Sequence, residues 1–269
     1  MSERLKKDLV ARCRELGIDM VGVAPVERWD EPPFEPWVPE EFRPKAVYPE
    51  ARSVVVIGLP VTLPVLETSP SIHYHQLYKT INEILDQSTY WISNFLNQRG
   101  HASLFIPRDG YGHIQVMKER PLAFFSHRHA AYLAGLGTFG LNNMVLTKEY
   151  GPRVRFGSVL TTAVLPGDPL MSEQLCTRCM RCVDVCPTKA LGEKDYPKSI
   201  TDKVACATRA VDLAGKFASP CGFCIKVCPI GEDRKLFQRE DLDIYDEEDQ
   251  KFTKHHKAWK HTRSYGSRK

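Results

Sequence analysis

Two cysteine-rich stretches decide the fold of this chain: Cys176-Thr-Arg-Cys179-Met-Arg-Cys182-Val-Asp-Val-Cys186-Pro187 and Cys221-Gly-Phe-Cys224-Ile-Lys-Val-Cys228-Pro229. They hold seven of the chain's nine cysteines, and Cys206 lies between them. An oxidised secreted fold usually spreads its disulfides along the whole chain. The clustering and the repeated Cys-x-x-Cys spacing therefore indicate metal binding in a reducing compartment.

The first stretch has the spacing of the cluster motif in bacterial ferredoxins, with two, two and three residues between cysteines and a closing proline. In such motifs the fourth cysteine binds the other cluster of the pair. The second stretch is one cysteine short, and Cys206 is the spare candidate. We therefore predict two 4Fe–4S clusters with these ligands: Cys176, Cys179, Cys182 and Cys228 for cluster one, and Cys186, Cys206, Cys221 and Cys224 for cluster two. Zinc sites are the alternative, since four cysteines also suit zinc.

Outside the cysteine region, hydrophobic periodicity predicts alternating helices and strands up to about residue 168, which indicates an α/β sandwich layer. Cys13 lies on the apolar stripe of the first helix, and we interpret it as a core residue. Five prolines between Pro32 and Pro44 argue against regular structure in the loop 25–49. The expected helices are 2–17, 73–99 and 127–136, and the expected strands are 18–24, 53–58, 101–106, 144–147 and 154–165.

The charge distribution sets the C-terminal end apart. The chain has 269 residues and a net charge of +4, but residues 251–269 carry seven Lys or Arg and no acid. Without those seven charges the rest of the chain is at −3. An acidic block at 240–249 precedes this basic segment, and such adjacent blocks usually form solvated chain. We predict three parts: a cofactor domain at 1–168, a ferredoxin-like domain at 169–235 and a flexible tail at 236–269, with a docking arm as the alternative for the tail.

No apolar run approaches the roughly 20 residues of a membrane helix, and the first residues lack the apolar core of a secretory signal. We therefore expect a soluble cytoplasmic protein with no membrane partner.

A glycine-rich turn, Gly135-Leu-Gly137-Thr-Phe-Gly140-Leu-Asn142-Asn143, follows the helix expected at 127–136. A dinucleotide fingerprint needs a strand before its glycines and a helix after them, and here the order is reversed. Glycines also allow the backbone to approach a large planar cofactor closely. A tight helix-to-strand turn is the alternative interpretation.

Three side chains before this turn have the chemistry of a proton donor: His127, His129 and Tyr111. The two histidines are two residues apart, so on a helix they point in different directions and do not share a metal. A structural role is the alternative for each of them.

The glycine turn, the stretch Thr147-Lys-Glu-Tyr-Gly-Pro-Arg-Val-Arg-Phe-Gly-Ser-Val-Leu-Thr-Thr162 and the double ferredoxin motif together resemble two related groups, the epoxyqueuosine reductases and the reductive dehalogenases. The resemblance covers roughly residues 120–235. It implies an α+β fold, in which a nitroreductase-like α/β domain that binds cobalamin precedes a two-cluster ferredoxin-like domain. It also implies a set of cofactor-binding residues: Gly135, Gly137, Gly140, Asn142, Asn143 and Thr161.

The chain departs from these groups at two points. The proton-donating aspartate that the resemblance places before the glycine turn has no counterpart in Ser126-His-Arg-His-Ala. The C-terminal helical-repeat region that helps epoxyqueuosine reductases to hold tRNA has no counterpart either, which argues against tRNA as a partner.

Three functions remain open. The first is a cobalamin-dependent iron–sulfur reductase, which takes electrons from a ferredoxin or flavodoxin and acts on a small molecule or modified nucleoside. The second is an electron-transfer protein that reduces a corrinoid or flavin on a partner. The third is a flavin enzyme on the same scaffold.

Overall fold

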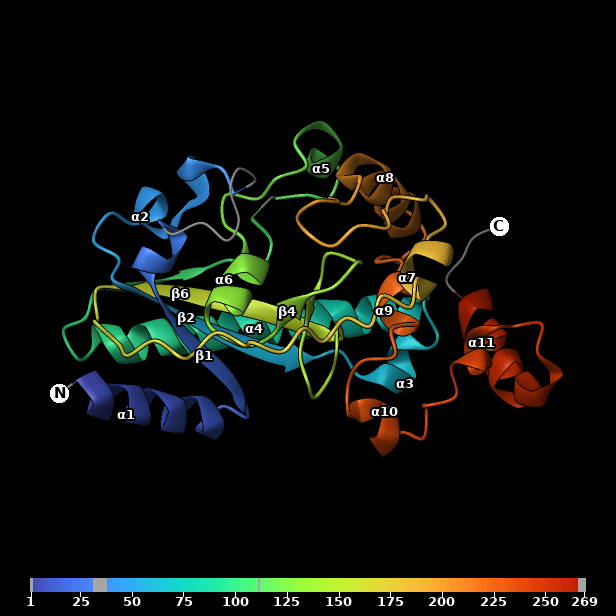
Figure 1. Ribbon diagram of the computed structural model, residues 1–269, viewed down its shortest axis with the longest axis horizontal. Helices are drawn as coiled ribbons and strands as arrows, with labels where there is room; N and C mark the ends of the chain where they lie inside the picture. The colour runs from blue at the N-terminus through green and yellow to red at the C-terminus, as the bar shows by residue number, and fades with distance from the viewer. Residues whose placement is uncertain (1, 31–37, 111, 266–269) are drawn as a thin grey trace.

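A four-stranded antiparallel sheet forms the centre of the computed structural model, which describes residues 2–30, 38–110 and 112–265 (Figure 1). Its order is β1 (Met20–Pro25), β2 (Ser53–Pro60), β6 (Val154–Thr161) and β3 (Ser103–Ile106). Val55 of β2 pairs with Val23 and Val159, and these three side chains share one face of the sheet. Val54 and Val56 belong to the core on the other face. Because both faces of β2 are covered, its sequence is a continuous apolar run.

Helices cover both faces and complete the expected sandwich (Figure 1). The long helix α4 (Ile72–Asn97) and α1 (Ser2–Glu15) pack on one face, and α6 (His127–Leu133) packs on the other. The Ser71 hydroxyl accepts a hydrogen bond from the Tyr74 N–H at 3.1 Å and so caps α4. Cys13 is fully buried, as predicted, and burial raises the pKa of its thiol to about 12.

The remaining elements of the first part are short. The described part of the expected loop 25–49 contains three helical turns instead of a fully irregular path, namely η1 (Val26–Trp29), η2 (Glu40–Phe42) and α2 (Pro44–Val47). The other short elements are α3 (Leu63–Leu66), α5 (Val116–Glu119), and the hairpin of β4 (Thr138–Phe139) and β5 (Val145–Leu146).

The cysteine-rich part is built from loops and five helices: α7 (Arg181–Asp184), α8 (Lys203–Ala214), α9 (Phe223–Lys226), α10 (Asp233–Leu236) and α11 (Thr253–Ser264). The cysteine-rich part contacts the segment before α4 and the first turn of α4. The Lys226 ammonium donates to the Ser69 carbonyl at 3.2 Å, and the His75 ring bonds the Ser219 carbonyl at 2.6 Å. Ile225 belongs to the same core as α1 and α4, so the two parts share hydrophobic packing.

The expectation of a flexible tail is wrong for the described residues 236–265. They form η3 (Leu242–Tyr245), η4 (Gln250–Phe252) and α11. Trp259 is only 5% exposed and stacks on Tyr245, and the His256 ring donates from Nε2 to the Ile244 carbonyl at 2.7 Å. His256 and Trp259, three residues apart on α11, bury their side chains and so anchor a segment that composition alone predicted to be solvated.

None of the described helices is long and apolar enough to cross a lipid bilayer.

Candidate iron–sulfur centre

The two cysteine stretches adopt the same local conformation. Met180 (φ 62°) and Gly222 (φ 76°) lie in the left-handed region and cap the one-turn helices α7 and α9. In each stretch one cysteine precedes the left-handed residue and the next lies in the helix. The two helices pack against each other. The local repeat in the sequence is therefore also a repeat in space.

Four of the predicted ligands meet at a small, mostly apolar pocket: Cys176, Cys179, Cys182 and Cys228. Three come from the first stretch and the fourth from the end of the second. Burial, followed by the neighbouring cysteines, raises the pKa of the Cys182 thiol to about 12. Such a concentration of thiol groups is a poor site for uncompensated thiolates, and bound iron would supply the compensating charge.

The other four predicted ligands lie close enough to influence one another. Burial raises the pKa of Cys224, and its neighbours Cys206, Cys221 and Cys186 raise it further. Cys206 comes from α8, outside both stretches. Among the described residues, no three His, Cys, Asp or Glu side chains converge as a single-ion site requires. Cys182 of the first set also raises the pKa of Cys224, and it packs in the same small cluster as Cys186 and Cys224, so the two sets lie next to each other.

Two buried arginines that the sequence analysis missed hold the loop that carries Cys228. The Arg153 side chain is fully buried and forms a two-pronged ion pair with Asp233, at 2.7 and 2.6 Å. It also donates to the carbonyls of Cys228 at 3.2 Å and Ile230 at 2.6 Å. Arg153 and Asp233 are 80 residues apart, so no local sequence pattern links them.

The second of these arginines is Arg234, which is 2% exposed. It donates to the Cys228 carbonyl at 2.6 Å, to the Lys226 carbonyl at 2.5 Å and to the Tyr245 hydroxyl at 3.0 Å. Burial raises the pKa of the Cys228 thiol to about 11. The positive charges of Arg153 and Arg234 act in the opposite direction and lower it, but their effect is smaller. The same positive charges stabilise a negatively charged cluster at this position.

The glycine turn serves packing. A Cβ on Gly137 would lie 2.0 Å from the Leu146 carbonyl oxygen across the β4–β5 hairpin. A Cβ on Gly135 (φ 74°) would lie 2.0 Å from the Pro169 carbonyl oxygen. Both neighbours are backbone of the protein itself, which favours the tight-turn interpretation over close approach to a planar cofactor.

The remaining residues of the predicted cofactor set also contact protein. Gly140 and Asn142 line the pocket of the cluster-one cysteines. The Asn143 side chain accepts from the Thr201 N–H at 2.6 Å and hydroxyl at 2.9 Å, and it donates to the Ser199 carbonyl at 3.2 Å. Thr161 is fully buried at the end of β6. Gly140, Asn142 and Asn143 therefore contact the cysteine-rich part.

The two histidines predicted as proton donors are both engaged. The His127 ring bonds the Ser158 hydroxyl at 2.8 Å and the Pro107 carbonyl at 3.0 Å, and burial lowers its pKa to about 4. The His129 ring bonds the Ser126 hydroxyl at 2.5 Å and the Tyr196 hydroxyl at 2.7 Å, and burial lowers its pKa as well. These contacts favour a structural role for both rings. Tyr111 lies outside the described residues.

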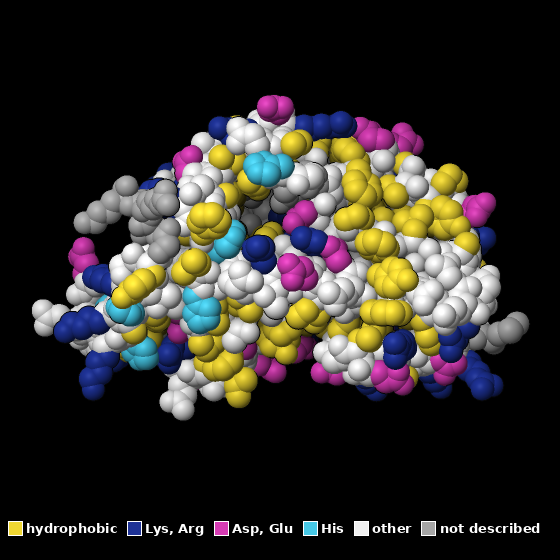
Figure 2. All heavy atoms as spheres, turned by 180° about the vertical axis from the view of Figure 1, so that it is seen from behind, with side chains coloured by type: hydrophobic (Ala, Val, Ile, Leu, Met, Phe, Trp, Pro, Cys, Tyr) yellow, Lys and Arg dark blue, Asp and Glu magenta, His cyan; other side chains and the backbone are white. Residues whose placement is uncertain are grey.

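Tyr78 and Asn82 on α4 and Arg155 on β6 form a polar group beside Tyr74. The Arg155 guanidinium lies 4.1 Å from the ring centre of Tyr78, and its Nη2 lies 3.4 Å from the Asp109 carboxylate. The Asn82 side chain is 3% exposed, and its Oδ1 has no hydrogen-bond partner among the described residues. Burial raises the pKa of the neighbouring Tyr74, and Cys221 and Cys224 raise it further, whereas Arg155 lowers it. Figure 2 shows a hollow near the middle of one face of the molecule, with His, Lys or Arg, and Asp or Glu side chains around it.

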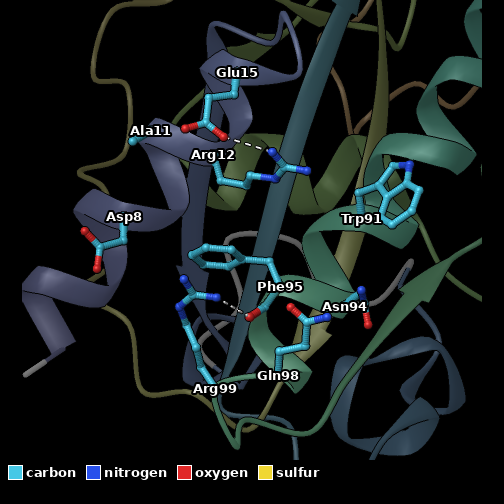
Figure 3. Close-up of a pocket in the computed structure, with 9 residues that line it drawn as sticks. All are labelled: Asp8, Ala11, Arg12, Glu15, Trp91, Asn94, Phe95, Gln98 and Arg99. Atoms are coloured by element: carbon cyan, nitrogen blue, oxygen red, sulfur yellow. Dashed lines mark hydrogen bonds and ion pairs between the residues drawn. The ribbon is translucent and has the colours of Figure 1, made fainter.

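A separate groove of about 540 Å³ lies between α1 and α4 (Figure 3). Arg99 stacks over Phe95 at 3.6 Å, and Arg12 pairs with Glu15 at 2.8 Å. The groove is lined by no cysteine and by none of the predicted catalytic residues, so it is not part of the candidate centre.

Comparison with known proteins agrees with the resemblance inferred from the motifs. A family model described as a 4Fe-4S binding domain matches residues 170–192. The epoxyqueuosine reductase of Bacillus cereus is 25% identical over 249 residues, which cover 84% of this chain and 64% of the relative. The tetrachloroethene reductive dehalogenase of Desulfitobacterium hafniense is 24% identical over 277 residues, which cover 84% of this chain and 48% of the relative. The chain thus spans less than two thirds of the length of these relatives.

Solved structures show the same fold. An epoxyqueuosine reductase in complex with a modified tRNA stem loop has a TM-score of 0.56 and 21% identity, and the match covers 84% of this chain and 65% of that one. A reductive dehalogenase described as B12-dependent has a TM-score of 0.64 and 17% identity, with 91% and 35% covered. The predicted relationship to these two groups of reductases is therefore confirmed, as is the mixed helix and sheet architecture with a ferredoxin-like motif.

Proposed function

We propose that this chain is an iron–sulfur reductase that passes electrons through two 4Fe–4S clusters to a cobalamin, which carries out a reductive reaction. The observation that carries the proposal is the meeting of Cys176, Cys179, Cys182 and Cys228 at one pocket, with Cys186, Cys206 and Cys221 close enough to Cys224 to raise its pKa. Each 4Fe–4S cluster transfers one electron at a time, and two clusters can deliver the electrons that this reductive step consumes.

The residues around cluster one fit a buried, negatively charged cluster. Arg153 and Arg234 both donate to the Cys228 carbonyl, and a single carboxylate, Asp233, pairs directly with Arg153. This leaves excess positive charge beside the cysteines. The excess favours the reduced cluster, which carries one more negative charge than the oxidised one.

The cobalamin is proposed to lie between the sheet and cluster two, within reach of Tyr78, Asn82 and Arg155. Two buried polar atoms support a ligand there, because neither the Asn82 Oδ1 nor the Arg209 Nε has a partner among the described residues. Buried polar atoms are nearly always paired, and the amide groups at the edge of a corrin are suitable partners. Arg209 lies near Cys221, whose pKa it lowers against the effect of burial. The bound cobalamin would supply the reductive chemistry, and the protein orients it and excludes water.

The substrate proposed is a modified nucleoside or another small molecule, and the electron donor is a ferredoxin or flavodoxin. The epoxyqueuosine reductase with a bound tRNA stem loop supports the nucleoside class. An electron-transfer protein without its own substrate is the second candidate. It is favoured by one observation: the histidines predicted as proton donors are occupied by hydrogen bonds to Ser158, Pro107, Ser126 and Tyr196.

The test is anaerobic purification followed by iron, sulfide and visible-absorption analysis. We expect about eight irons and eight sulfides per chain, since each of two clusters holds four, and a corrinoid spectrum after reconstitution with cobalamin. Cys206→Ser is expected to lose cluster two and keep cluster one, and Cys13→Ser is the matched control that changes neither. A flavin spectrum would move the chain to the flavin class, and about four irons in the wild-type protein would refute the two-cluster proposal.

A further inference from the structure

The β4–β5 hairpin covers the pocket of the cluster-one cysteines. Gly140, Leu141, Asn142 and Leu146 line this pocket together with the four thiols. Leu141 is 2% exposed and Leu146 is 1% exposed, so the hairpin excludes water from this side of the pocket.

The tip of the hairpin carries buried donors. Within the described structure, the backbone N–H groups of Leu141 and Asn142 have no acceptor, although both residues are buried. Buried backbone N–H groups are nearly always paired. The Asn142 side chain is held in place by its carbonyl oxygen, which accepts from the Met144 N–H at 3.1 Å. Its amide nitrogen makes no hydrogen bond with the described residues, so it is available to a ligand in the pocket that Asn142 lines.

We propose that this hairpin tip is a hydrogen-bonding cap for cluster one, and that the Asn142 side-chain amide donates to a cluster sulfur and so raises the reduction potential of the cluster. The proposal rests on the proposed function, since it requires a 4Fe–4S cluster at Cys176, Cys179, Cys182 and Cys228. Hydrogen bonds to the sulfurs are one of the factors that set cluster potentials. They stabilise the more negative, reduced state more than the oxidised one.

Asn142 is suited to this role because its neighbours are not. Besides the cysteines, Asn142 and Thr177 are the polar side chains among the described residues that line the pocket. Thr177 is exposed, so its hydroxyl can bond water instead. Asn143 is committed to Thr201 and Ser199. Asn142 is thus a positioning residue for the electron path, and the backbone N–H groups beside it add to the same effect.

The experiment is an anaerobic redox titration followed by electron paramagnetic resonance, on the full chain with both clusters. Asn142→Leu removes the amide at similar volume. At a fixed solution potential we expect the ratio of reduced to oxidised cluster one to fall about tenfold, which is about 59 mV for a one-electron couple. The signal of cluster one is identified in Cys206→Ser, and the unchanged potential of cluster two is the internal standard.

Two further variants complete the design. Thr177→Val removes a hydroxyl from the same pocket and is expected to leave the potential unchanged. Asn142→Asp keeps the acceptor for the Met144 N–H while removing the donor, so it reports on the bond if Asn142→Leu fails to assemble the cluster. It should lower the potential further, because it also adds negative charge.

An unchanged potential of cluster one in Asn142→Leu, with its four irons retained, would overturn the cap, and so would an unchanged potential in Asn142→Asp. An equal shift in Thr177→Val would overturn it too. A wild-type protein without a cluster-one signal would instead refute the proposed function, before any variant is compared.

Discussion

Gly137→Ala tests whether the glycine turn serves packing or a cofactor. The added Cβ would lie 2.0 Å from the Leu146 carbonyl oxygen and 2.8 Å from both the Leu146 carbonyl carbon and the Val145 Cγ1. The closest ordinary contact between such carbon and oxygen atoms is about 3.3 Å. The Leu146 carbonyl is backbone and cannot rotate away from the added Cβ. One strand of the β4–β5 hairpin must therefore move by more than about 1 Å.

Overpacking a close-packed site costs typically about 1–3 kcal/mol, and a clash with backbone belongs at the upper end. We expect a loss of about 3 kcal/mol, which lowers the melting temperature by roughly 6–12 °C for a chain of this size. Because the hairpin lines the pocket of cluster one, iron at that cluster should fall as well.

The assay is thermal unfolding by circular dichroism, with iron content measured on the same samples. Gly112→Ala is the matched control, because a Cβ there would meet no atom within 4 Å. It should be neutral or stabilise by about 0.4–1 kcal/mol, since alanine restricts the unfolded chain. A Gly137→Ala protein that melts with the wild type would refute the packing argument. If such a protein also lost corrinoid binding, the turn would be a cofactor seat after all.

Three further predictions concern other buried side chains. Arg153→Met leaves the buried Asp233 without its partner and should cost about 3–5 kcal/mol in a urea titration; a loss no larger than that of an exposed arginine such as Arg178 would contradict the assignment. Trp259→Ala should cost about 3–5 kcal/mol, because it empties the contact between α11 and Tyr245; an unchanged melting temperature would restore the flexible tail. Burial lowers the pKa of His127 to about 4, so the unfolded state, with a pKa near 6.5, binds more protons between these values. Stability should therefore be full above about pH 6.5 and lower by about 2 kcal/mol at pH 5. Equal urea midpoints at pH 5 and pH 7.5 would rule this out. So would a His127→Gln protein whose free energy of unfolding depends on pH as strongly as that of the wild type.

The sequence by itself determined what depends on local pattern. The continuous apolar run of β2 and the long apolar face of α4 predicted their elements to within about two residues, because a helix or strand has a fixed period that must match its buried face. The cysteine spacing predicted the set of Cys176, Cys179, Cys182 and Cys228 that meets at one pocket, and each stretch forms its own turn around a left-handed residue at Met180 or Gly222. The relationship to epoxyqueuosine reductases and reductive dehalogenases was also predicted from the sequence, because it rests on the order of the motifs along the chain.

The tertiary structure alone decided the roles of single side chains. Gly137 and His127 had the composition of a cofactor site, but the backbone and hydroxyl groups they meet come from β5, β6 and the segment after β3. The pairing of Arg153 with Asp233 crosses 80 residues, and the burial of Trp259 depends on Tyr245. A sequence pattern records the period of one element, whereas these contacts depend on which elements the folded chain brings together. The physical reason is that burial and hydrogen bonding are properties of the surroundings of a side chain, and those surroundings exist only after packing.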